Sequence, residues 1–207
     1  MVQERGARFS IRSLSEPVRL SRPLELAAGE CIAFSGPSGS GKSRFLRALA
    51  DLDPNDAEVQ LDGQSRRDFA APAWRQRVTY LAAESGWWAS CVEHHFADEN
   101  LAAAKVLLPE LALPAAALSW EVARLSTGER QRLALIRALV QVPDVLLLDE
   151  PTASLDGKAT GHVESLLRAE MERGAVIFLV THDPAQADRL ASRHCTVADL
   201  TIGEAAS

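Results

Sequence analysis

Apolar residues gather along the chain in two kinds of pattern. Continuous apolar runs at 31–34, 145–148 and 175–180 are typical of strands that a parallel sheet buries on both faces. Each run is followed by a segment with the apolar spacing of a helix, at about 44–50, 158–172 and 184–193. Strands that alternate with helices predict an α/β fold with a mostly parallel sheet.

Other segments have weaker patterns. Short runs at 8–11, 23–26 and 58–61 predict a small β region, which we expect to be antiparallel, and 78–82 predicts a strand that enters the core. From about 90 to 121, Leu and Ala dominate at helical spacing, interrupted by Pro109 and Pro114, and a further helix is expected at about 128–140. We expect one domain over residues 1–207, with a helical subdomain inserted at about 90–124.

Composition narrows the possible partners. The net charge is −6 and the isoelectric point about 5.4, so no basic face indicates nucleic acid. Three cysteines, an odd number lying far apart, favour a reduced, cytoplasmic protein. No apolar run approaches the roughly 20 residues that span a bilayer, and residues 1–12 are charged and carry no apolar signal region. Any membrane role is therefore expected to come through a partner.

A glycine-rich stretch carries the strongest chemical signal. Between the predicted strand 31–34 and the helix at 44–50 lies the segment Gly36-Pro37-Ser38-Gly39-Ser40-Gly41-Lys42-Ser43. Strand, glycine-rich turn and helix form the context of a phosphate-binding P-loop, whose backbone N–H groups and helix dipole hold anions. Lys42 can reach the β- and γ-phosphates, and the Ser43 hydroxyl can bind Mg²⁺. The alternative is a Gly/Ser turn that matches the pattern by chance.

An acidic pair and a capping motif add to this signal. Asp149 and Glu150 end the apolar run 145–148, at the edge where parallel sheets bind ligands. Asp149 would hold Mg²⁺, directly or through water, and Glu150 would act as general base on the attacking water. The segment 125–131 begins another predicted helix, which Ser126 can cap and where Gly128 leaves room for a phosphate; alone it is an ordinary capping motif.

Taken together, these motifs resemble the nucleotide-binding domain of ABC transporter ATPases. Residues 36–43 match the Walker A motif, and 145–150 match Walker B with its adjacent glutamate. Residues 125–129 resemble the signature motif, Ser154-Leu155-Asp156 match the D-loop, and His182 matches the switch histidine. The motifs occur in the order of the family over residues 36–182.

The resemblance implies ATP hydrolysis with Mg²⁺ in a head-to-tail homodimer. Each ATP would lie between the P-loop of one subunit, including Arg44, and the signature motif of the other. The resemblance assigns catalysis to Lys42, Glu150 and His182, and a link between the two sites to Asp156. It assigns contact with the nucleotide in trans to Ser126, Thr127, Gly128 and Glu129.

Several positions depart from the pattern of the family. Thr127 replaces the first glycine of the signature, and Glu129 replaces its glutamine and brings a negative charge next to phosphate. Arg44 replaces the usual Thr, and the Q-loop glutamine is expected where Ala83 stands. Glu84, the next residue, is a further candidate metal ligand. Phe9 is the aromatic residue nearest to the adenine-stacking position, although it is also expected in the core.

Three further residue groups lie between 87 and 95. Trp87 and Trp88 are adjacent, so we expect at most one to be buried and at least one to line the groove that receives the membrane subunit in this family. Cys91, His94 and His95 are close in sequence, but a four-ligand zinc site needs more partners than this segment offers. Exposed polar residues of a helix are the preferred interpretation of this group.

The function expected from the sequence is the ATP-hydrolysing subunit of an ABC transporter, peripheral on the inner face of the cell membrane through a separate permease. A soluble ABC-type ATPase that is not coupled to transport is the first alternative. A non-hydrolysing regulatory module is the second, suggested by the altered Q-loop. The transported substrate and the direction of transport are not encoded in this chain, because the membrane subunit selects the substrate.

Overall fold

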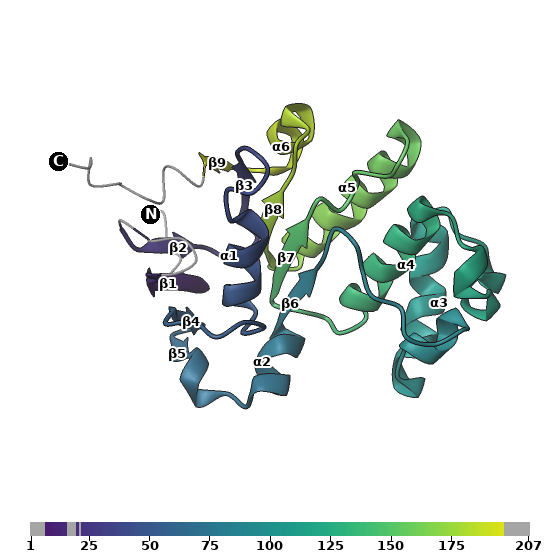
Figure 1. Ribbon diagram of the computed structural model, residues 1–207, viewed down its shortest axis with the longest axis horizontal. Coiled ribbons are helices and arrows are strands. Elements are labelled where there is room, and N and C mark those ends of the chain that lie inside the picture. Colours follow the sequence, from purple (N-terminus) through teal and green to yellow (C-terminus); the bar gives the residue numbers. More distant parts are fainter. Residues whose placement is uncertain (1–6, 16–19, 21, 197–207) are drawn as a thin grey trace.

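A five-stranded, entirely parallel sheet forms the centre of the molecule (Figure 1). The computed structural model describes residues 7–15, 20 and 22–196. The strand order is β6-β7-β8-β3-β9, with bounds β3 Cys31–Ser35, β6 Val78–Leu81, β7 Val145–Asp149, β8 Val176–Val180 and β9 Arg193–Thr196. The parallel α/β core predicted from the apolar runs is confirmed.

A second, antiparallel sheet has the order β2-β1-β4-β5. Its strands are β1 Phe9–Ser13, β2 Leu24–Leu26, β4 Glu58–Leu61 and β5 Gln64–Ser65. Helix α1 (Lys42–Leu49) lies between the two sheets (Figure 1). Aromatic rings fill this layer: the ring of Phe178 on β8 lies 5.5 Å from that of Phe9 and 5.9 Å from that of Phe34, measured between centroids.

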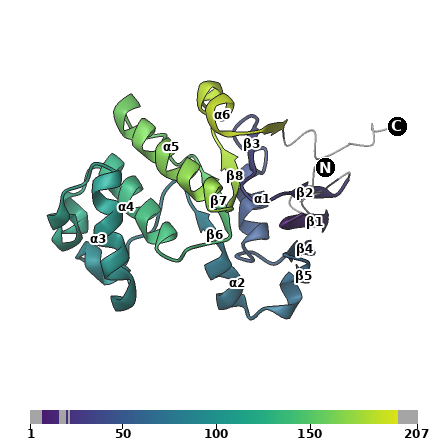
Figure 2. The ribbon, with the colours of Figure 1, turned by 180° about the vertical axis from the view of Figure 1, so that it is seen from behind.

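The other face of the parallel sheet is covered by α4 (Thr127–Leu139) and α5 (Gly157–Glu172) (Figure 2). Successive side chains of a strand point to opposite faces, so each central strand supplies both cores. Leu146 and Leu148 of β7 join the core under α4 and α5, whereas Val145 and Leu147 join the core around α1. All five residues of β7 and of β8 are buried, which explains their unbroken apolar sequence.

Between β6 and α4 the chain is less regularly helical than its sequence predicts. One α-helix, α3 (Leu101–Glu110), packs on α4, and the rest is short 3₁₀ turns at 92–95, 98–100, 115–119 and 122–124. Pro109 lies in the last turn of α3 instead of ending the helical segment early. The two ends of the segment meet where the Val92 amide donates to the Trp120 carbonyl at 3.0 Å and the Val122 amide donates to the Ser90 carbonyl at 2.8 Å.

Two elements differ from the sequence prediction. Helix α2 (Ala71–Arg77) was not predicted, because it is short and buries only Trp74, which leaves no apolar period to recognise. The helix predicted for 184–193 is shorter in the structure, because α6 spans Pro184–Leu190 and Arg193 begins β9. The backbone pairing of β9 with β3 decides this outcome against the helical pattern.

Within the described residues, none of the helices combines the length and apolar character needed to cross a bilayer. Residues 1–6 of the predicted charged N-terminus lie outside the described residues.

Candidate active site

The glycine-rich loop connects β3 to α1 and turns its backbone inward. Gly36, Gly39 and Gly41 have φ angles of 145°, 80° and 93°, a region that favours glycine. A Cβ atom at Gly36 would also lie 3.3 Å from the Ser40 hydroxyl oxygen. This conformation and the N-terminus of α1 together provide the N–H groups that hold a phosphate.

Lys42 is buried in this loop with 7% of its surface exposed. Its Nζ donates to the carbonyl oxygens of Gly36 at 2.8 Å and Pro37 at 2.9 Å, so the ammonium group lies above the loop. A cavity of about 200 Å³ adjoins it, lined by residues 38–44 together with Asp149, Glu150 and His182. The structure therefore brings into one cavity residues predicted from four separate parts of the sequence pattern: the loop, the start of α1, the end of β7 and the segment after β8.

Asp149 lies at the end of β7 and is 4% exposed. Its Oδ2 accepts a hydrogen bond of 3.0 Å from the phenol of Tyr80, on the neighbouring strand β6. Burial, and then the charge of Asp149, raise the pKa of Tyr80, so the phenol remains a donor. Sequence reasoning missed Tyr80 because its contact depends on the pairing of strands 69 residues apart.

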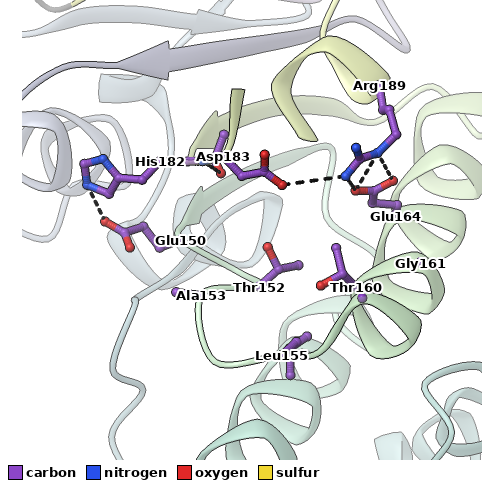
Figure 3. Close-up of a pocket in the computed structure, with 12 residues that line it drawn as sticks. Glu150, Thr152, Ala153, Leu155, Thr160, Gly161, Glu164, His182, Asp183 and Arg189 are labelled. Atoms are coloured by element: carbon purple, nitrogen blue, oxygen red, sulfur yellow. Dashed lines mark hydrogen bonds and ion pairs between the residues drawn. The ribbon is translucent and has the colours of Figure 1, made fainter. Parts of the chain in front are cut away.

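Glu150 adopts a left-handed backbone conformation with φ of 50°. For a non-glycine residue this conformation is unfavourable by about 1–2 kcal/mol, and the Glu150 amide is held by the Val180 carbonyl at 2.9 Å. The His182 Nε2 lies 3.1 Å from the Glu150 Oε1 (Figure 3). The predicted general base and the predicted switch histidine are therefore direct neighbours.

A larger cavity, of about 720 Å³, lies beside Glu150 and His182, between α5 and α6 (Figure 3). Its wall contains an ion pair between the exposed Arg189 of α6 and the buried Glu164 of α5, in which Arg189 donates to both carboxylate oxygens at 2.7 to 3.1 Å. The hydrogen bonds from Arg189 hold the pKa of Glu164 below its usual range. This pair fixes α6, which directly follows His182, against α5.

The signature residues form the start of α4. The Ser126 hydroxyl accepts from the Glu129 amide at 3.3 Å, and Glu129 Oε2 accepts from the Ser126 amide and hydroxyl, both at 2.8 Å. These hydrogen bonds lower the pKa of Glu129. A Cβ atom at Gly128 would lie 3.2 Å from the Ser154 carbonyl oxygen, which explains the glycine there. Neither Ser126, Thr127, Gly128 nor Glu129 lines the phosphate cavity of its own chain.

The D-loop residue Asp156 caps α5, because its Oδ1 accepts from the Ala159 amide at 2.8 Å. Upstream of it, the segment 150–154 receives two buried glutamines that sequence reasoning missed. Gln131 of α4 donates to the Glu150 carbonyl at 2.6 Å and accepts from the Ser154 amide at 3.2 Å. Gln186 of α6 donates to the Thr152 hydroxyl at 2.8 Å. No motif in the sequence signals these contacts.

Glu84 is exposed and lines a separate cavity of about 320 Å³ with Trp87, Thr127, Arg130 and Gln131 among its neighbours. The structure therefore does not bring Glu84 together with Ser43 and Asp149. Phe9 is fully buried in the core around α1 and cannot stack on an adenine.

The two tryptophans differ in burial. Trp88 is 72% exposed, whereas Trp87 packs against the core below α4. The guanidinium of Arg137 lies 4.8 Å and 5.0 Å from the rings of Trp87 and Trp88. The expectation that His95 is an exposed helix residue is wrong: it is 5% exposed, and its Nε2 accepts from the amides of Trp88 at 2.9 Å and Ala89 at 3.0 Å. His95 is buried because it satisfies these two amides.

A phosphate-binding loop that joins a strand of a parallel sheet to a helix, and that faces an Asp-Glu pair at the end of a strand two places away in the same sheet, defines a P-loop nucleoside triphosphatase. The model of the ABC transporter family matches residues 22–153, and the chain therefore belongs to that family. It is an ATPase of the ABC type.

Relatives extend over most of the chain. The lipoprotein-releasing system ATP-binding protein LolD 1 of Rhodopirellula baltica is 36% identical over 89% of this chain and 88% of its own length. The phosphate import ATP-binding protein PstB 2 of Natronomonas pharaonis is 33% identical over 88% and 72%. Among solved structures, the ATP-binding cassette MJ0796 in a dimeric post-hydrolysis state has a TM-score of 0.73 at 23% identity and covers 91% of this chain and 93% of its own. The predicted family and fold are confirmed.

Proposed function

We propose that this chain is the ATP-hydrolysing subunit of an ABC transporter and drives a separate membrane-spanning permease. The observation that carries the proposal is the pair of Glu150 and His182, 3.1 Å apart at the edge of the cavity above the P-loop. The relatives that are named as ATP-binding proteins of transport systems support it. The full chain, 1–207, would act as one domain in which residues 90–124 are the inserted helical subdomain.

The P-loop cavity fits ATP with Mg²⁺. Residues 36–44 would hold the phosphates, and Lys42 would neutralise charge on the β- and γ-phosphates. Ser43 and Asp149 line the same cavity and supply the hard oxygen atoms that Mg²⁺ prefers. The bound ion would neutralise developing charge on the phosphates. Glu84 lines another cavity and would reach the metal only after a movement of residues 82–86.

Hydrolysis would follow from the position of Glu150. Its carboxylate would accept a proton from the water that attacks the γ-phosphate. His182 would contact the γ-phosphate in the same chain and, through its contact with Glu150 Oε1, keep the carboxylate directed at the water. Tyr80 would hold Asp149 from the adjacent strand β6. Lys42 would stabilise the charge that builds up as the phosphate bond breaks.

Two copies of the chain would form the complete site. Ser126, Thr127, Gly128 and Glu129 do not line the cavity of their own chain, which is consistent with service to the nucleotide of a second copy. Asp156 would link the two sites from the start of α5. The dimeric, post-hydrolysis state of MJ0796, with ADP and Pi bound, supports a homodimer that forms with ATP.

The permease would dock near Trp87 and Trp88. Trp88 offers an exposed aromatic ring of the kind that anchors protein interfaces. Through this contact the chain would be peripheral on the inner face of the cell membrane, in the cytoplasm. No nucleic acid partner is expected, since the net charge is −6.

The direct test is Glu150→Gln in the full chain. We expect ATP binding to persist, hydrolysis to become very slow, and an ATP-bound dimer to accumulate in size-exclusion chromatography. Glu110→Gln, at an exposed position at the end of α3, is the control and is expected to behave as wild type. Turnover at the wild-type rate by Glu150→Gln would remove Glu150 from the role of base. A dimeric, active enzyme that never associates with a permease would favour the soluble ATPase instead.

A further inference from the structure

Gln131 is buried, with 8% of its surface exposed, and both ends of its side-chain amide are used. The Nε2 group donates to the Glu150 carbonyl at 2.6 Å, and Oε1 accepts from the Ser154 amide at 3.2 Å. One side chain from the signature helix α4 therefore spans the chain segment that joins the Asp-Glu pair of β7 to the D-loop.

The segment that Gln131 spans needs outside support. Glu150 has a left-handed backbone, which a non-glycine residue retains only where its surroundings impose it. The Val180 carbonyl fixes the Glu150 amide on one side, and Gln131 fixes the Glu150 carbonyl on the other. The Glu150 carbonyl also accepts a hydrogen bond from the Ala153 amide, which is longer, at 3.3 Å. Gln131 thus makes the shortest hydrogen bond to the peptide that sets the direction of the Glu150 side chain.

The same helix carries the signature motif. Gly128 lies so close to Ser154 and Leu155 that a Cβ atom would be 3.2 Å from each, so α4 and the segment 150–155 are in direct contact at two points. A shift of α4 when Ser126 engages a second copy would therefore be passed to the Glu150 carbonyl through Gln131. Ala83, at the Q-loop position, has no side-chain amide for such a link.

We propose that Gln131 is a positioning residue, which holds Glu150 in the orientation for hydrolysis and couples that orientation to the position of the signature helix. The proposal rests on the proposed role of Glu150 as general base. Gln131 does not line the phosphate cavity; it acts through the backbone of Glu150 and Ser154.

The first experiment is Gln131→Met in the full chain, because methionine has a similar length and makes no such hydrogen bonds. A misplaced catalytic group lowers turnover steeply, so we expect kcat to fall by about 10- to 100-fold. KM for ATP and the affinity of the isolated subunit for nucleotide should stay within about twofold, because P-loop contacts are untouched. Gln76→Met, at an exposed position on α2, is the matched control and should retain wild-type kinetics. An unchanged kcat in Gln131→Met, measured on protein that melts as a single folded species, would overturn the proposal.

The second experiment uses Gln131→Glu and does not depend on the stability of the methionine variant. A protonated carboxyl can donate to the Glu150 carbonyl and accept from the Ser154 amide, whereas a carboxylate can only accept. The ratio of kcat in Gln131→Glu to kcat in wild type should therefore rise as the pH falls, by up to roughly tenfold per pH unit until the new carboxyl is protonated. Taking the ratio at each pH removes the pH dependence that the two proteins share, and Glu84 and Arg130 line the adjoining cavity in both proteins. A ratio that stays flat over the range in which both proteins are folded contradicts the proposal.

Glu150→Gln, measured in parallel, separates the role of Glu150 from that of Gln131. Normal turnover in Glu150→Gln would overturn the role of Glu150 and, with it, the role of Gln131. Loss of turnover in Glu150→Gln together with normal turnover in Gln131→Met and a flat pH ratio in Gln131→Glu would overturn the role of Gln131 alone.

Discussion

Arg189→Met should destabilise the protein, because it leaves the carboxylate of Glu164 buried without its main partner. Arg189 makes three hydrogen bonds of 2.7 to 3.1 Å to Glu164, whose side chain is 5% exposed. Removing one partner of a buried pair costs about 3–5 kcal/mol. The cost at Glu164 should be lower, about 1–2 kcal/mol, because Arg189 is itself 44% exposed and exposed pairs contribute only about 0–1 kcal/mol. Arg168 also remains 3.4 Å away, and water can enter through the 720 Å³ cavity that Glu164 lines.

The assay is unfolding of the full chain by urea and by heat. For a domain of this size, 1–2 kcal/mol corresponds to a fall of roughly 2–8 °C in Tm. Arg168→Met is the matched control, since it removes a single longer contact of 3.4 Å and should cost less than about 1 kcal/mol. Glu164→Gln combined with Arg189→Met should recover part of the loss, because no buried charge remains.

The pH dependence of the protein's stability gives an independent check on this account of the ion pair. The pKa of Glu164 is lowered in the folded protein by Arg189, so the stabilisation is complete above the ordinary glutamate pKa of about 4.3. It is lost as the pH falls through the depressed pKa of the folded state. The stability difference between wild type and Arg189→Met should therefore be constant near neutral pH and shrink in acid. Equal stability of Arg189→Met and Arg168→Met at neutral pH, or a difference that does not change in acid, would refute this account of the pair.

Outcomes are also expected for three further variants. Ser126→Arg should leave nucleotide binding by the isolated chain intact but abolish dimerisation and hydrolysis. Mixing this variant with Lys42→Ala should restore some activity through one complete site per heterodimer. A strong loss of nucleotide affinity in Ser126→Arg alone would contradict the proposal that Ser126 contacts the nucleotide of the second copy. Trp88→Ala should lower the free energy of unfolding by no more than about 1 kcal/mol, because the ring is 72% exposed and loses little beyond its contacts with Arg137 and His95. It should retain basal ATPase activity while permease association falls about 30-fold, which is the loss of an anchor worth about 2 kcal/mol. Trp87→Ala, which removes a ring packed against the core, should instead lower the melting temperature. Normal co-purification of the permease with Trp88→Ala would exclude docking at the ring of Trp88.

The sequence was sufficient where the signal is local. Strand, glycine turn and helix are contiguous at residues 31–49, so the P-loop could be predicted before any packing was known. The fully buried strands β7 and β8 likewise have unbroken apolar runs, which indicated their place in the sheet. The place of Asp149 and Glu150 in the site could be predicted from β7, because acidic residues at the carboxyl end of a parallel strand lie at the edge where ligands bind.

The contacts that orient these groups could not be predicted, because they join residues far apart in the chain. Tyr80 reaches Asp149 only once β6 pairs with β7. Gln131 reaches Glu150 only once α4 packs on the sheet. The burial of His95 could not be predicted either. The polar sequence of the segment 90–95 indicated an exposed face, but the His95 ring accepts hydrogen bonds from two backbone amides.

The capping arrangement at the start of α4 has a consequence for how firmly two copies can hold together. The Ser126 hydroxyl has one proton, and that proton is already donated to Glu129 Oε2 at 2.8 Å. In the proposed homodimer, a phosphate bound to the second copy would have to replace Glu129 as the acceptor of this proton. Closure would then exchange one hydrogen bond for another and gain little net free energy at that point. The negative charge of Glu129 also repels the incoming phosphate. An interface whose contacts are exchanged rather than added would open again easily, which would suit a homodimer that separates after each round of hydrolysis.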